Sequence, residues 1–508
     1  MFAKINSVGI FGIDTYMLHI EADVSGGLPC FDVVGLPDTA VKESRNRVRA
    51  AIKNSGFKFP AGRITVNLAP ADKKKEGAVY DLPILISILC ASGQINFDFS
   101  SCAFVGEISL DGKISAVNGI IAMAITAKQN GIENLFVPTD NACEAAAIDG
   151  INIYGVSDIS DIINHFDGFT VLEKTEYTPS PVNSAINFPD FSEVKGQTQA
   201  KKALEIAAAG GHNVIMIGPP GSGKSMLAKR LPSILPEMTF EESIETTKIH
   251  SVAGLLDKNN PLVTARPFRS PHHTVSFAGF TGGGTVPRPG EISLAHNGVL
   301  FLDELPEFKR DVMEAMRQPL EDGTITVSRV AATVSYPSRV MLVAAMNPCP
   351  CGFYGHPTKE CTCTQNAVNR YLGKISGPLL DRLDLHVEVP AVDFNQLNSD
   401  QKTETSAEIR ARVNTARAIQ TERYRGLGFT CNADLTPALL KKFCVMSPEA
   451  EMILKRSFDA LGLSGRSYDR ILKVARTIAD LNTSEIIQKE HILSAIRFRT
   501  LDRKYWNE

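Results

Sequence analysis

Residues 218–225 are Gly-Pro-Pro-Gly-Ser-Gly-Lys-Ser, and they decide the fold of the central part of this 508-residue chain. They match the phosphate-loop pattern G-x-x-x-x-G-K-[ST] at every fixed position. A short apolar run, 213–217, precedes the loop as a strand would, and a helical pattern follows it. Glycines let backbone N–H groups converge on phosphate oxygens, a lysine reaches the terminal phosphates, and the hydroxyl binds Mg²⁺. The residues expected to hold the nucleotide are Gly218, Pro219, Pro220, Gly221, Ser222, Gly223, Lys224, Ser225 and Met226.

A second apolar run, 299–302, ends in two acids, Asp303 and Glu304. A continuous apolar run is typical of a buried parallel strand, and open α/β sheets bind ligands at the carboxyl ends of their strands. We expect Asp303, with Ser225, to organise Mg²⁺. Glu304 is expected to polarise the attacking water as general base.

Two further residues complete a predicted hydrolytic site. Asn347 ends another buried strand and is expected to orient the water; the alternative is an Asn that caps a turn before Pro348. Arg382 lies between acids on a short helix. An arginine supplied to a neighbouring subunit's nucleotide stabilises transition-state charge, and the alternative is an intrachain salt bridge with Asp381 or Asp384.

Composition excludes several classes of protein. The 53 basic and 56 acidic residues give a net charge of −3, which excludes a globally basic nucleic-acid coat and leaves only local patches for DNA. No apolar run approaches the roughly 20 residues of a membrane span. The ten cysteines are spread along the chain, apart from one cluster, and do not form a secreted disulfide framework. We expect a cytoplasmic, reduced protein that does not contact a membrane.

Composition along the chain predicts three folded parts. Residues 1–170 alternate short apolar runs with Gly and Pro around one amphipathic helix (39–55), which indicates an α+β domain. Residues 171–190 are Pro-rich and polar, as in a linker. Residues 191–395 alternate strands and helices, as in a parallel α/β sheet, and residues 396–508 are helical.

These motifs, in this order, resemble the AAA+ ATPases, and more closely the ComM/YifB family in their magnesium-chelatase-like branch. The resemblance is carried by the long gap of 79 residues between Lys224 and Asp303, with its insertions 268–276 and 279–284, and by a predicted β-hairpin, 323–336, before the Asn347 strand. It implies a central AAA+ P-loop NTPase domain that uses ATP and Mg²⁺, and a C-terminal helical lid. It also implies that Arg466, in Ser-Gly-Arg-Ser-Tyr-Asp-Arg (464–470), faces the nucleotide, with Arg470 as the alternative.

The first part of the chain is similar to the Lon-protease-like domain of this family, through the strand–turn–strand at 106–119. Val79 occupies the place of the nucleophilic serine, and Ile121 lies near the place of the lysine. Neither side chain can attack a carbonyl or take a proton, so we expect no protease activity. Lys73, Lys74 and Lys75 are candidate phosphate contacts, or a solvated loop.

Four cysteines are packed into fifteen residues as two C-x-C pairs: Cys349, Cys351, Cys361 and Cys363. Four thiolates can close a tetrahedral, structural Zn²⁺ site. The alternatives are four free thiols, or a site in which His356 replaces one cysteine. In the first insertion, His272 and His273 are expected to form a hydrogen-bonded loop pair.

The family resemblance implies a ring, expected to be a hexamer, that acts on single-stranded, duplex or branched DNA. As a helicase it would drive branch migration of recombination intermediates during natural transformation, with Arg329 of the hairpin moving along the phosphate backbone. The alternative is a chelatase-type ATPase that remodels a protein partner for metal insertion. A Lon-like protease is a third hypothesis, opposed by Val79 and Ile121.

Overall fold

The computed structural model describes residues 1–177, 188–257, 260–284, 287–329, 332–391 and 403–506. Its N-terminal part is built on a seven-stranded mixed sheet in the order β3-β4-β2-β1-β5-β8-β9. The strands are β1 (Phe2–Phe11), β2 (Asp14–Ser25), β3 (Cys30–Val34), β4 (Arg63–Ala69), β5 (Cys102–Phe104), β8 (Asn134–Pro138) and β9 (Asn152–Val156). A small hairpin, β6 (Glu107–Ile108) with β7 (Ile114–Ser115), confirms the predicted strand–turn–strand.

Five helices cover this sheet: α1 (Thr39–Asn54), α2 (Asp81–Ala91), α3 (Ile120–Gln129), α4 (Thr139–Ala145) and α5 (Ile159–Phe166). The predicted amphipathic helix is α1, which begins where the Asp38 side chain accepts the Val41 N–H. Val41, Val48 and Ile52 line its buried face. The apolar α2 is buried along almost its whole length, which is why its sequence has no polar face.

The central part contains a five-stranded parallel sheet in the order β11-β14-β17-β10-β18. These strands are β10 (Val214–Ile217), β11 (Phe268–Arg269), β14 (Gly298–Leu302), β17 (Val340–Met346) and β18 (Leu385–Glu388). Val214 and Met216 pack into one hydrophobic core, which the C-terminal helices share. Ile215 and Ile217 point the other way, into a second core. Burial on both faces explains why these strands are continuous apolar runs.

The predicted hairpin before the Asn347 strand is confirmed as β15 (Thr324–Arg329) paired with β16 (Ala332–Pro337). A second small ribbon pairs β12 (Gly282–Gly283) with β13 (Arg288–Pro289). The helices of the central part are α6 (Thr198–Gly210), α7 (Lys224–Arg230), α8 (Phe240–Ala253), α9 (Phe277–Thr281), α10 (Glu291–Leu294), α11 (Arg310–Ala315), α12 (Arg317–Asp322), α13 (Gln365–Leu372) and α14 (Gly377–Leu380).

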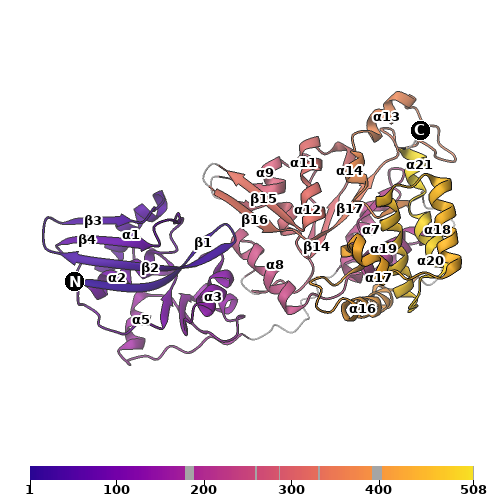
Figure 1. Cartoon of the computed structure of the whole chain (residues 1–508). Helices are drawn as coiled ribbons and strands as arrows, with labels where there is room; N and C mark the ends of the chain where they lie inside the picture. Colours follow the sequence, from indigo (N-terminus) through magenta and orange to yellow (C-terminus); the bar gives the residue numbers. More distant parts are fainter. Residues whose placement is uncertain (178–187, 258–259, 285–286, 330–331, 392–402, 507–508) are drawn as a thin grey trace.

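The C-terminal part is helical, as predicted (Figure 1). Its helices are α16 (Ser406–Arg423), α17 (Pro437–Phe443), α18 (Pro448–Leu461), α19 (Gly465–Leu481), α20 (Lys489–Arg497) and α21 (Leu501–Tyr505). Within the described residues, no helix is both long and apolar enough to cross a bilayer. The proposed linker 171–190 and the boundary at 395 remain predictions, because residues 178–187 and 392–402 lie outside the described residues.

The N-terminal part contacts the central part at two places, both near α8 and the hairpin (Figure 1). Helix α3 packs against α8. Phe11 and Ile13, at the turn between β1 and β2, pack against the core that contains Val334 and Tyr336 of β16. The hairpin is therefore held between the sheet of the central part and the N-terminal part.

Candidate functional site

The phosphate loop lies between the end of β10 and the start of α7, at the carboxyl edge of the parallel sheet. Gly223, directly before the helix, has φ of +88°, a left-handed conformation that glycine adopts without strain. Gly218 is equally constrained, since a Cβ there would lie 2.1 Å from the carbonyl oxygen of Val389. The two glycines are thus needed for the path of the loop. The loop ends at a helix N-terminus, where backbone N–H groups are free to bind an anion.

Lys224 is held inside this loop. Its Nζ donates to the carbonyl oxygens of Gly218 (2.7 Å) and Pro219 (2.9 Å) and to Asn347 Oδ1 (3.2 Å). Burial lowers the pKa of Lys224 to about 8, although the charges of Asp303 and Glu304 act to raise it. The ammonium group is therefore poorly solvated and suited to gain an anionic partner.

The two acids at the end of β14 face different neighbours. Ser225 Oγ donates to Asp303 Oδ2 at 2.5 Å, so the predicted pair of Mg²⁺ ligands is brought together. Glu304 has φ of +53°, an uncommon backbone conformation for a non-glycine residue, and its side chain is exposed toward the insertion loop. There its Oε2 lies 3.8 Å from Nδ1 of His273.

His273 is a neighbour of Glu304, and the sequence analysis did not predict this contact. The predicted loop pair exists in part, since the rings of His272 and His273 lie 4.1 Å apart and His272 Nδ1 contacts Thr274 Oγ1 at 2.8 Å. However, residues 273 and 304 are separated by an insertion and a strand. No sequence pattern indicated that they would meet.

These residues surround a pocket of about 370 Å³. Its lining brings together the phosphate loop, both acids and Asn347: Pro220, Gly221, Ser222, Gly223, Lys224, Ser225, Met226, Asp303, Glu304, Met346 and Asn347. Gly218 and Pro219 do not line it; their carbonyl groups hold Lys224 instead. Asn347 is therefore placed in the pocket and in contact with Lys224.

Arg382 does not line this pocket within one chain. It follows α14, and its guanidinium donates to the Pro378 carbonyl oxygen (2.6 Å) and to the carboxylate of Glu321. Its side chain is 12% exposed, whereas Glu321 is 64% exposed. Arg382 thus forms an intrachain ion pair with Glu321, and not the alternative pair with Asp381 or Asp384. A role toward a neighbouring subunit remains a prediction.

Arg466 and Arg470 of α19 have different surroundings, and neither lines the pocket. Arg470 is bound to Asp384, a buried residue that also contacts His212 Nδ1 at 3.2 Å. Arg466 is 68% exposed and reaches Asp381 Oδ2 at 3.2 Å. Because Arg470 is held in a structural ion pair, Arg466 is the residue of the two that is able to reorient. Its expected role toward the nucleotide stays a prediction.

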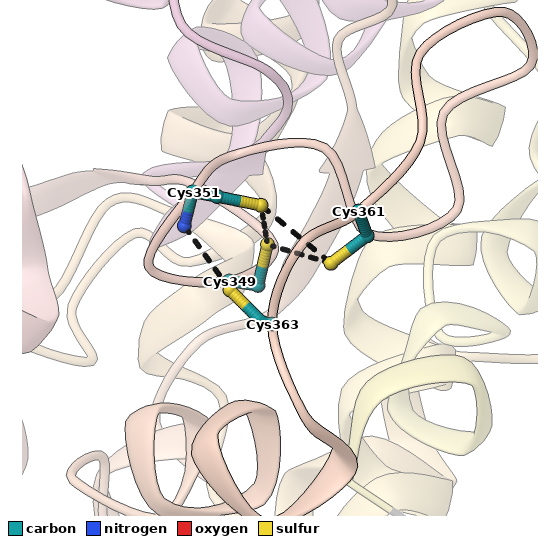
Figure 2. A group of neighbouring side chains, drawn as sticks. All are labelled: Cys349, Cys351, Cys361 and Cys363. Carbon is teal, nitrogen blue, oxygen red and sulfur yellow. Dashed lines mark hydrogen bonds between the residues drawn. The ribbon is translucent and has the colours of Figure 1, made fainter.

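The four clustered cysteines converge in the loop after β17, as Figure 2 shows. The sulfur atom of Cys349 lies 3.3 Å from that of Cys351 and 3.7 Å from that of Cys361. The backbone N–H of Cys351 donates to Cys363 Sγ at 3.4 Å. All four sulfur atoms lie within 4.8 Å of one another.

This geometry fits a tetrahedral metal site. Sulfur atoms bound to Zn²⁺ at about 2.3 Å are about 3.8 Å apart, close to the separations found here. Backbone N–H groups of Cys351 and Tyr354 donate to two of the sulfurs and would stabilise thiolates. His356 is outside the group, because its Nδ1 accepts N–H groups of its own loop. Four cysteine ligands leave no open position, so a bound Zn²⁺ would be structural.

The loop that carries the four cysteines (residues 348–364, the cysteine loop) also contacts the phosphate loop directly. A Cβ on Gly352 would lie 2.4 Å from Cδ of Pro220, and Gly352 has φ of +86°. Asn347, which lines the pocket, precedes Cys349 by only two residues. The first part of the cysteine loop, residues 348–352, thus lies directly beside the nucleotide pocket.

In the N-terminal part, Val79 and Ile121 are both buried in the hydrophobic core. The lysine run behaves differently from the prediction. Lys75 is fully buried and donates to the carbonyl oxygen of Lys73 (2.7 Å), and Lys74 pairs with Glu76 at 2.6 Å. Lys75 therefore cannot contact a phosphate group, since its ammonium is used to close its own loop.

The parallel sheet, the phosphate loop and the two acids at the neighbouring strand end define a P-loop protein of the AAA+ class. Family models confirm the branch. "Magnesium chelatase, subunit ChlI" matches residues 190–397, "Subunit ChlI of Mg-chelatase" matches 20–141, and "Magnesium chelatase, subunit ChlI C-terminal" matches 403–499.

Relatives that match over the whole length of the chain identify the family within this branch. The chain is 45% identical to competence protein ComM of Haemophilus influenzae, over 99% of this chain and 98% of that protein. It is 44% identical to the uncharacterized protein YifB of Escherichia coli, over 97% and 96%. A partial similarity, 29% identity over 28% of this chain and 27% of the relative, connects it to Lon protease 2 of Bacillus subtilis. The chain belongs to the ComM/YifB family of magnesium-chelatase-like AAA+ proteins.

Proposed function

We propose that this protein is an ATP-hydrolysing AAA+ motor that assembles into a ring, a hexamer, and acts on DNA. In this proposal it promotes branch migration of recombination intermediates during natural transformation. The observation that carries it is the full-length similarity to a competence protein, at 45% identity, in a chain whose phosphate loop, two acids and Asn347 line one pocket. The β15–β16 hairpin supports it, since it is fixed to the sheet at the Asn347 strand.

The chemistry proposed for the pocket follows from its residues. Lys224 and the N-terminus of α7 would bind the phosphates, and Ser225 with Asp303 would hold Mg²⁺. The metal would supply charge neutralisation at the phosphates. Glu304, exposed and close to His273, would take the proton of the attacking water, which Asn347 would orient.

The test measures ATP hydrolysis without DNA and with duplex, single-stranded or four-way-junction DNA. We expect stimulation by DNA and ATP-dependent movement of the junction. The Lys224→Ala variant should lose both, and Glu304→Gln should keep ATP binding while losing hydrolysis. Absence of DNA binding at low salt would contradict the proposal. Cleavage of casein that depends on Lys224 would instead support a protease.

A second candidate is a chelatase-type ATPase that remodels a protein partner for metal insertion. The specific observation in its favour is that all three matching family models describe magnesium chelatase. It requires no DNA, so ATP hydrolysis that no DNA form stimulates would favour it.

Subunit mixing tests whether Arg382 completes the pocket of a neighbouring copy. Arg382→Ala and Lys224→Ala should each be inactive, because each removes one half of every shared pocket. A mixture should regain activity, because some pockets then combine an intact Lys224 with an intact Arg382 from the next copy. Arg370→Ala, on the exposed side of α13, is the matched control. Unchanged turnover in Arg382→Ala would contradict the shared pocket.

A further inference from the structure

Basic residues are concentrated in one segment of the N-terminal part. Residues 42–75 contain ten Lys and Arg and two Asp and Glu, whereas the rest of residues 1–170 contain three and seventeen. An otherwise acidic domain thus carries one strongly basic region.

Four of them form one face of α1. Lys42, Arg45, Arg49 and Lys53 are spaced by three, four and four residues and are all exposed. This spacing places them in a row along one side of a helix. From the first to the last, the row is about 16 Å long. We call these four residues the α1 basic face.

The face is rigidly supported by the core of the N-terminal part. The opposite side of α1 is buried through Val41, Val48 and Ile52. The Arg49 guanidinium lies 5.3 Å from the centre of the Phe59 ring. Arg45 Nη1 donates to the carbonyl oxygen of Phe31 in β3 at 3.3 Å. The helix is therefore held against the core, and the two arginine side chains are held in place by these contacts.

No carboxylate among the described residues forms an ion pair with these four side chains. Arg47 of the same helix shows the contrast, because it points to the other side and binds Asp81 Oδ2 at 2.6 Å. The exposed residues of α1 are all polar. The face therefore lacks the apolar core that protein–protein interfaces use, and it has no apolar residues to insert into a bilayer.

We propose that the α1 basic face binds the phosphate backbone of DNA without reading its sequence. The inference rests on the proposed function and adds a DNA-contacting site outside the ATPase part. Over about 16 Å, a duplex presents roughly five phosphates on each strand, so four cations in a row meet a matching density of charge. In Figure 1, α1 lies beside β3 and β4, at the end of the N-terminal part away from the helices of the C-terminal part.

The test uses the full chain and two variants with the same change in charge. Lys42→Gln/Arg49→Gln/Lys53→Gln removes three charges from the face. Lys4→Gln/Lys113→Gln/Lys128→Gln removes three exposed charges elsewhere in residues 1–170. Affinity for a fluorescent 40-base-pair duplex is measured between 50 and 300 mM salt. Thermal unfolding checks that both variants fold.

We expect the face variant to bind duplex at least tenfold more weakly at the lowest salt. Its slope of log affinity against log salt should decrease by about 2 to 3, as expected for three lost phosphate contacts. The control variant should stay within about twofold of the parent. If the triple variant unfolds at a lower temperature than the parent, the single variants Lys42→Gln and Lys53→Gln are measured in its place. Neither side chain forms a hydrogen bond or ion pair with another described residue, so we expect both variants to fold.

The outcomes are distinguishable. Equal affinities and slopes for the two variants, with a parent that binds DNA, would overturn the inference and leave the proposed function intact. A parent that binds no DNA would overturn both. Binding to anionic lipid vesicles that depends on the face, with unchanged DNA binding, would assign the face to a membrane surface and overturn the inference.

Discussion

Lys224 shows how a single buried charge can link nucleotide binding to pH. Burial lowers its pKa to about 8, against the opposing charges of Asp303 and Glu304. Phosphate groups placed beside the ammonium would raise that pKa. The bound form then holds more protons than the free form above pH 8. Binding therefore takes up a proton there, and affinity falls as the pH rises.

We expect the affinity for a non-hydrolysable ATP analogue to be constant up to about pH 7.5. Above pH 8 it should fall by up to about tenfold per pH unit. Titration calorimetry in two buffers of different ionisation enthalpy should report proton uptake at pH 8.5. Lys229→Gln, an exposed lysine of the same helix, should not change the profile. A flat profile with no proton uptake would contradict the linkage.

At the scale of elements, the cysteine loop is expected to depend on its metal. Purified protein should contain about one zinc per chain, and Cys349→Ser or Cys361→Ser should lose it. The loop contacts Pro220 and follows Asn347 directly in the chain. We therefore expect the nucleotide affinity of these zinc-free variants to fall by about fivefold, or about 1 kcal/mol.

Metal content is measured by mass spectrometry of the purified protein, and loop order by hydrogen exchange over residues 348–364. Cys143→Ser, an exposed cysteine far along the chain from the cluster, is the control and should keep its zinc. Folded, zinc-free protein from zinc-supplied cells would contradict the prediction.

Elements with a strong local pattern could be predicted from the sequence, and contacts between distant segments could not. The phosphate loop, the acids after β14, the hairpin and α1 each carry their own pattern of glycine, charge or apolar spacing. The partner of Arg382 illustrates the limit. Two acids lie within two residues of it, but the chain turns so that Glu321 of α12 receives the guanidinium. Lys75 illustrates the same limit, because no local pattern predicts that its ammonium group is buried and donates to the carbonyl oxygen of Lys73.

At the scale of the whole molecule, a buried hydrogen-bonded contact helps the apolar contacts to join the N-terminal part to the central part. Ser251, near the end of α8, accepts the Gly119 N–H at 2.9 Å, and its hydroxyl donates to the carboxylate of Glu144. Glu144 also accepts the Ile121 N–H at 3.2 Å. Burial raises the pKa of Glu144, although these donors oppose the rise. Ile121, which the resemblance to Lon proteases places near the position of the catalytic lysine, thus lies beside a contact between the two parts.

We expect Ser251→Ala to loosen this contact selectively. The Gly119 N–H would lose its acceptor in a buried place, at a cost of about 1–3 kcal/mol. Hydrogen exchange at the Gly119 amide should therefore accelerate by about 5- to 150-fold. Exchange at Ile121 should change less, because Glu144 still accepts its N–H.

The matched control is Ser243→Ala, on the same helix. Its hydroxyl donates to the carbonyl oxygen of Val263 at 2.7 Å, which lies within the central part. That variant should leave exchange at Gly119 unchanged. If DNA-stimulated ATP hydrolysis is measured in parallel, Ser251→Ala should weaken the stimulation more than Ser243→Ala does, because α8 would be held less tightly to the part that carries the α1 basic face. Equal protection of Gly119 in the parent and in Ser251→Ala would show that the two parts are held together by the apolar contacts alone.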